Sequence, residues 1–131
     1  MILWEVRPLP KSGNPAAQAY NGVQQEMFMS QAKVVALKEP EIRRRLRSLR
    51  GWKWADGQIA RTFDFKNYYQ TTAFVNAVAW ISHQENHHPD MEVGYNHCRV
   101  CYSTHSVGGL SANDFACAAK VNALMDKPPR D

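Results

Sequence analysis

The sequence predicts a two-layer α+β sandwich, in which three helices pack on one face of a four-stranded antiparallel sheet. Three amphipathic segments alternate with two pairs of short β-type segments, in the order helix, two strands, helix, two strands, helix. Tight turns join the strands of each pair, which is typical of antiparallel sheets, and each helix has an apolar side that needs cover. A chain of 131 residues has room for one such domain.

Composition and charge are those of a soluble globular protein, with 44% hydrophobic and 21% charged residues. The opening apolar run, residues 1–4, is far too short for a signal peptide or a membrane span. Three cysteines, Cys98, Cys101 and Cys117, are too few and too unevenly placed for a disulfide framework, so we interpret them as reduced thiols. We therefore expect a cytoplasmic protein that does not contact a membrane.

The first helix is expected to begin near Glu39. Pro40 suits the first turn of a helix, and Ile42, Leu46 and Leu49 form one apolar stripe. The other side of this helix is basic, with Arg43, Arg44, Arg45, Arg47 and Arg50. These arginines and the net charge of +4 permit a nucleic-acid patch, but the strand and loop segments lack the interleaved aromatic and basic residues of a single-strand platform. We favour a solvated helix face.

A β-hairpin follows the first helix. Asp56 and Gly57 form the turn between a short strand carrying Trp52 and Trp54 and a second strand at residues 58–65. Large aromatic side chains on a strand bury well against a helix. We therefore expect both tryptophans to pack in the core rather than to stack on a cofactor.

The second half of the chain carries a helix at residues 67–86, a short strand at residues 92–95, a turn at Asn96 and a strand at residues 99–105. The helix has an apolar face formed by Phe74, Ala77, Val78 and Ile81. Alternation along the last strand would put Arg99, Cys101, Ser103 and His105 on one face, and Val100, Tyr102 and Thr104 on the other. The short strand would lie at an edge of the sheet.

The last helix is expected to open at Ser111, after a turn at Gly108 and Gly109. Asp114 stands three residues after Ser111, which is the spacing of a capping box. The apolar side of this helix carries Phe115, Ala118, Val121 and Met125.

All five histidines lie within residues 83–105: His83, His87, His88, His97 and His105. Histidine titrates near neutral pH, so such a cluster is a natural source of paired acid and base. Pro89 must end the preceding helix near His87 and His88, and His105 would close the last strand. A helix end and a strand end could thus form the two lips of one pocket, which makes a proton-transfer site the leading hypothesis.

These residues resemble the signature of the pterin-4a-carbinolamine dehydratases. The matching motifs are H-Q-E-N-H-H-P-D at residues 83–90, Tyr95, S-T-H-S at residues 103–106, G-G-L-S at residues 108–111, and Asp114. Gly51 and Trp52, and the strand I-A-R-T-F-D-F at residues 59–65, also resemble that family. The likeness covers roughly residues 40–125, so we divide the chain into an N-terminal arm of unassigned role at residues 1–38 and a dehydratase-like domain at residues 39–131.

The resemblance implies dehydration of a 4a-hydroxytetrahydropterin to the quinonoid dihydropterin, by a hydro-lyase that needs no cofactor and no metal. It implies the catalytic set His87, His88 and His105, and a substrate-binding set of Asn86, His87, His88, Ser103, Thr104, His105 and Ser106. We expect His87 and His105 to be the acid–base pair and His88 to orient the substrate. The sequence does not say which histidine is the acid.

Two positions depart from better-known members of the family. His83 stands where others carry glutamate, and Asn86 where some carry aspartate, so two carboxylates that could tune a histidine pKa are missing. His83 is either a solvent-facing residue or a support for the site, and His97 lies in a turn without an expected role.

A zinc site is the rival chemistry, because His83 and His87 are four residues apart on a helix and Cys98 and Cys101 have zinc-knuckle spacing. Positions three apart on a strand point to opposite faces, so we favour the metal-free interpretation.

The resemblance also implies partners. Members of the family form homodimers or homotetramers through sheet edges and helices, serve tetrahydrobiopterin recycling, and are linked to aromatic amino-acid hydroxylation. The alternative function is a non-catalytic partner-binding or transcription-coactivator module of the same fold, which would use the arginine-rich helix or the N-terminal arm. Intact His87, His88 and His105 favour the enzyme.

Overall fold

The computed structural model describes residues 34–126, and the predicted order of elements is present there. The elements are α2 (Glu39–Arg47), β1 (Lys53–Ala55), β2 (Gln58–Asp64), α3 (Tyr68–Glu85), β3 (Asp90–Val93), β4 (His97–Tyr102), the short 3₁₀ helix η1 (His105–Val107) and α4 (Ala112–Met125). Residues 1–33 of the predicted N-terminal arm lie outside the described residues. The following residues contact the domain, since the backbone N–H of Leu37 donates to the carbonyl of Leu110 at 2.8 Å.

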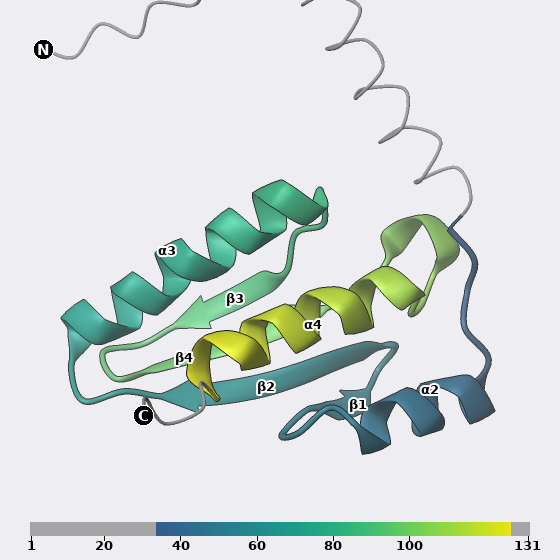
Figure 1. The fold of residues 1–131 in the computed structure, drawn as a ribbon, viewed down its shortest axis with the longest axis horizontal. Coiled ribbons are helices and arrows are strands. Elements are labelled where there is room, and N and C mark those ends of the chain that lie inside the picture. Colours follow the sequence, from purple (N-terminus) through teal and green to yellow (C-terminus); the bar gives the residue numbers. More distant parts are fainter. Residues whose placement is uncertain (1–33, 127–131) are drawn as a thin grey trace, which may run out of the picture. The chain divides into compact units, whose positions relative to one another are not determined.

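The four strands form one antiparallel sheet in the order β1-β2-β4-β3. The central pair, β2 and β4, runs in register from Ile59 opposite Tyr102 to Asp64 opposite His97. Helices α3 and α4 lie side by side over one face of this sheet, and α2 lies beside β1 (Figure 1). The predicted α+β class, with three helices and a four-stranded antiparallel sheet, is confirmed. Within residues 34–126, no helix combines the length and the apolar character needed to cross a membrane.

The core forms where the two layers meet. Ile59, Val100 and Tyr102 of the sheet, and Val78 and Val121 of the helices, have no exposed surface. These positions follow the alternation of the strands and the apolar stripes of the helices, so binary patterning alone accounts for which side of each element is buried.

The tryptophans of the first hairpin pack against this core, as predicted. Trp52 is 6% exposed, and its indole N–H donates to the side-chain oxygen of Asn122 in α4 at 2.8 Å. Trp54 is partly buried, and the guanidinium of Arg43 lies 5.6 Å from its ring centroid. A buried indole needs such a hydrogen-bond partner, and Asn122 supplies it.

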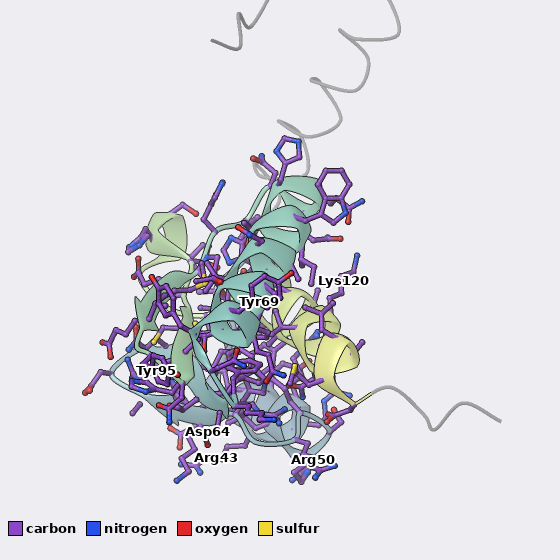
Figure 2. All side chains as sticks on the ribbon, turned by 90° about the vertical axis from the view of Figure 1, so that its left-hand side faces the viewer. Arg43, Arg50, Asp64, Tyr69, Tyr95 and Lys120 are labelled. Carbon is purple, nitrogen blue, oxygen red and sulfur yellow. The ribbon has the colours of Figure 1, made fainter. Side chains whose placement is uncertain are left out.

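Three arginines of the basic side of α2 form ion pairs with acidic residues of the same helix. The shortest contacts are 2.7 Å from Arg43 to Glu39, 2.5 Å from Arg44 to Glu41 and 2.9 Å from Arg45 to Glu41. In Figure 2, Arg43 and Arg50 project outward from the domain. These ion pairs within the helix are what a solvated face requires.

The positions of the last two strands differ from prediction. Strand β3 runs from Asp90 to Val93, two residues earlier than expected, because Asp90 already pairs with Cys101 and the N–H of Gly94 closes the turn onto the carbonyl of His97. His97 therefore begins β4 instead of lying in the turn.

The end of β4 also differs. β4 stops at Tyr102, because β2 begins at Gln58 and leaves no strand for later residues to pair with. The expectation that His105 closes the strand is therefore wrong: His105 begins η1, and Thr104 makes an isolated bridge with Gly109. The predicted alternation persists as far as Thr104, which is buried like Val100 and Tyr102.

Candidate active site

The end of α3 fixes the position of His87. Asn86 adopts the left-handed conformation at φ 50°, which asparagine tolerates better than most residues, and the N–H of His87 donates to the carbonyl of Ser82 at 3.0 Å. This bond spans five residues, as in a Schellman motif. Pro89 then holds His88 away from the helical region. The chain therefore turns sharply at the pair of histidines, as the sequence predicted.

His87 is held by a buried carboxylate. Its Nε2 atom lies 2.5 Å from Oδ1 of Asp114, which has no exposed surface, and the His87 side chain is itself only 14% exposed. Because an ionised carboxylate can only accept, Nε2 is the nitrogen that carries the proton. In the neutral ring this leaves Nδ1 as the atom that can take up another proton.

Asp114 also joins the helix end to the strand end. Its second oxygen, Oδ2, accepts from the hydroxyl of Thr104 at 2.7 Å and from the backbone N–H of Ser111 at 2.9 Å. The bond from Ser111 belongs to the capping box that the sequence predicted, which is present at the start of α4. One buried carboxylate thus ties together the residue after α3, the residue after β4 and the first turn of α4.

Thr104 uses its polar groups within the protein. Besides its bond to Asp114, its hydroxyl lies 2.7 Å from that of Ser111, and its backbone N–H donates to Gly109 at 2.8 Å. Its side chain therefore supports the carboxylate beside His87.

A hollow of about 340 Å³ adjoins this network. Its lining residues are Asp56, Gly57, Gln58, Asp90, Ser103, Thr104, His105, Gly108 and Gly109. His105 is exposed at the start of η1 and is the histidine that borders the hollow. Thr104 lines the hollow and shares Asp114 with His87, whereas His87 and His88 are not among the residues that line the hollow. A larger hollow of about 440 Å³, over β1 and β2, has no histidine in its lining.

The other predicted residues do not take part in the network of His87, Asp114 and Thr104. Asn86, His88 and Ser106 are exposed on the segments that flank His87 and His105. His83 is exposed on α3, with its ring 6.0 Å from that of Trp80. His97 begins β4, at the opposite end of that strand from Thr104.

The His87 ring makes an offset stack with the ring of Tyr102. The two rings are nearly parallel, with 15° between their planes and 5.7 Å between their centroids. Burial raises the pKa of the Tyr102 hydroxyl well above its usual 10.0, so this side chain stays neutral at physiological pH. The imidazole is therefore bordered by one carboxylate and one neutral aromatic ring.

The rival zinc site is not assembled. Cys98 lies on the helix-covered face of the sheet opposite Phe63, whereas Cys101 lies three positions further along β4, on the other face. Nε2 of His87 is already bonded to Asp114. Residues 34–126 contain no group of three or more His, Cys, Asp or Glu side chains that could hold a metal ion.

The contact between His87 and Asp114 is the main feature that sequence reasoning missed. The capping box located the carboxylate at the start of the last helix and uses its Oδ2 atom, but its Oδ1 atom has a partner 27 residues away. The sequence held part of the information, because Asp114 is one of the residues that resemble the family signature. It did not indicate that Asp114 contacts His87.

A family model described as pterin 4 alpha carbinolamine dehydratase matches residues 35–124. A protein of Nitrosomonas eutropha, placed by its name among the pterin-4-alpha-carbinolamine dehydratases, is 64% identical over 93 residues, which are 70% of this chain and 82% of the relative.

Two solved structures are similar as well. A transcriptional coactivator/pterin dehydratase from Brucella melitensis has a TM-score of 0.66 at 34% identity, over 69% of this chain and 98% of that one. A pterin dehydratase-like protein, described as a RuBisCO assembly factor in the alpha-carboxysome, has a TM-score of 0.52 at 26% identity, over 60% and 93% of the two chains.

Proposed function

Because this chain belongs to the pterin 4 alpha carbinolamine dehydratase family, we propose that it is a hydro-lyase that converts a 4a-hydroxytetrahydropterin to the quinonoid dihydropterin. The structural observation that carries the proposal is the hydrogen bond between His87 and the buried Asp114, beside the hollow that His105 borders. It supplies one histidine of defined tautomer and one exposed histidine on a neighbouring segment, as a two-proton reaction requires.

The reaction moves two protons and needs no change of oxidation state. The C4a–O bond breaks as the hydroxyl accepts a proton and leaves as water. The N5–H bond gives up its proton to a base, and its electrons form the C4a=N5 double bond. Hydroxide is a poor leaving group, so a general acid and a general base each supply about 10²–10⁴-fold.

We assign the base to His87 and the acid to His105. His87 donates through Nε2 to Asp114, so its Nδ1 is the acceptor for the N5 proton. His105 is exposed and borders the hollow, so its protonated form would reach the departing hydroxyl and recover its proton from water. After each cycle His87 releases to water the proton that it took from N5. Both histidines are then back in their starting protonation states.

We assign orientation of the pterin to residues on the same two segments: Asn86, His88 and Ser106, which are exposed, and Ser103, which is partly buried and lines the hollow. Thr104, the remaining member of the predicted binding set, would act by holding Asp114 and Ser103 in place. No metal or organic cofactor is needed for this chemistry, so we expect turnover to survive dialysis against a chelator.

The decisive experiment is turnover of a freshly generated 4a-hydroxytetrahydropterin, followed spectrophotometrically, with the uncatalysed dehydration measured alongside. A rate that rises in proportion to the protein concentration supports the proposal. A rate equal to the uncatalysed one, with folded protein, would refute it.

Membership of the family supports a proposal for the cellular role. We propose a function in tetrahydrobiopterin recycling beside an aromatic amino-acid hydroxylase, in the cytoplasm. A homodimer or homotetramer is also proposed, since β3 is an edge strand of the sheet formed by residues 34–126, and an edge strand can pair with a second copy. Size-exclusion chromatography with light scattering tests the oligomeric state.

A partner-binding role is the second candidate. It is favoured by the likeness to a structure described as a RuBisCO assembly factor. A partner-binding protein has no need of the His87–Asp114 pair, whereas a dehydratase does. The turnover experiment therefore separates the two candidates.

A further inference from the structure

We propose that Tyr102 is a positioning residue for His87, because its buried ring is the flat support that keeps the imidazole turned toward Asp114. The inference deepens the proposed function and rests on it for the effect on turnover. The effect on the imidazole itself can be observed whether or not the protein is an enzyme.

One hydrogen bond is not enough to orient an imidazole. The bond from Nε2 to Asp114 fixes the position of one ring atom but leaves the ring free to tilt and rock about it. A second constraint comes from the backbone, where the N–H of His87 donates to Ser82. The stack on Tyr102, at 5.7 Å and 15°, restricts the remaining tilt. The three constraints come from three different elements: α4, α3 and β4.

Tyr102 is rigid enough to act as this support. It has no exposed surface, its backbone is opposite Ile59 in the central pair of strands, and its ring lies 5.9 Å from that of Trp52. A close-packed side chain of this kind sits in one rotamer minimum, which makes its ring a fixed neighbour for His87.

The ring, and not the hydroxyl, carries this role. The Tyr102 hydroxyl is buried and has no hydrogen-bond partner within residues 34–126, while the hydroxyl of nearby Ser82 donates to the carbonyl of Val78. It therefore makes no hydrogen bond to His87 or Asp114. A phenylalanine at this position would present the same flat face, which provides a matched control.

The experiment compares Tyr102→Phe with Tyr102→Leu in the full chain. Leucine fills much of the same space with an apolar group but offers no flat face. Two-bond ¹H–¹⁵N correlation spectra at about pH 8 report which nitrogen of His87 carries the proton. We expect one Nε2-protonated form in the wild type and in Tyr102→Phe, and a mixture of tautomers in Tyr102→Leu.

Kinetics provide the second measurement. Tyr102→Leu should lower kcat by about 10-fold and change KM by less than about twofold, whereas Tyr102→Phe should keep both. Tyr102→Met replaces Tyr102→Leu if the latter does not fold by circular dichroism.

A wild-type tautomer and normal kcat in the leucine variant would overturn the inference, as would equal losses in both variants. If the wild type shows no turnover but the spectra differ as expected, the positioning role stands and the proposed function falls.

Discussion

Nε2 of His87 lies 2.5 Å from Oδ1 of Asp114, a carboxylate that is fully buried at the start of α4. Compared with better-known members of the family, carboxylates are missing at His83 in α3 and at Asn86 directly after it. The structure shows that the carboxylate beside His87 comes from a different helix. Its second oxygen holds Thr104 and the N-terminus of α4, so one side chain serves both the fold and the site.

The catalytic assignment predicts that His87→Ala and His105→Ala each lower the dehydration rate by about 10–10³-fold, because each removes one proton-transfer partner. His97→Ala is the matched control, since His97 is exposed at the other end of β4 and should keep the wild-type rate. Circular dichroism checks that the variants are folded. Normal rates in both catalytic variants would contradict the assignment.

Asp114→Asn should weaken both stability and turnover. The amide replaces one acceptor oxygen by a donor, which leaves a buried partner unsatisfied and lowers the free energy of unfolding by about 1–3 kcal/mol. Turnover should fall about as far as in His87→Ala. The double variant should be little worse than the poorer single one, because two residues that act as a unit are not additive. Urea unfolding and kcat measure the two effects, and fully additive losses in kcat would argue against a coupled pair.

The buried thiol of Cys117 predicts a pH dependence of stability. Burial raises the pKa of Cys117 from 9.0 to about 12. Above pH 9.0 the unfolded chain releases this proton while the folded protein retains it, so the free energy of unfolding falls as pH rises toward 12. The free energy of unfolding falls by at most about 1.4 kcal/mol per pH unit for this one thiol. Well below pH 9.0 the thiol is protonated in both states and does not affect stability.

Cys117→Ala provides the comparison for this prediction. The variant lacks the thiol, so its stability difference from the wild type should shrink by about 1 kcal/mol between roughly pH 8 and pH 10. Urea unfolding at both pH values measures the change. A constant difference would mean that the thiol ionises equally in the two states.

Deletion of residues 1–28 should leave turnover largely unchanged. His87, His105 and Asp114 all lie within the part of the chain that matches the family, residues 35–124. The kinetic constants of the truncated protein, at an unchanged oligomeric size, test this. A folded truncated protein without activity would mean that a residue of the N-terminal arm reaches the site.

Much of the fold could be predicted because its signals are local. Asn86 and Pro89 end α3, Ser111 and Asp114 cap α4, and Asp56 with Gly57 turns the first hairpin, where both residues have positive φ. Each of these depends on a few neighbouring residues. The strand limits were less predictable, because the length of β4 depends on where β2 begins, more than forty positions earlier in the chain.

The sequence by itself determined the α+β class, the sharp turn at His87 and His88, and the resemblance that points to pterin dehydration. Only the tertiary structure decided which groups surround His87: Asp114 on one ring atom, Tyr102 on the ring face and Thr104 behind the carboxylate. The physical reason is that local patterns specify which side of an element is buried. They do not specify which buried side chains of different elements meet, since that depends on the packing of α3 and α4 against β4.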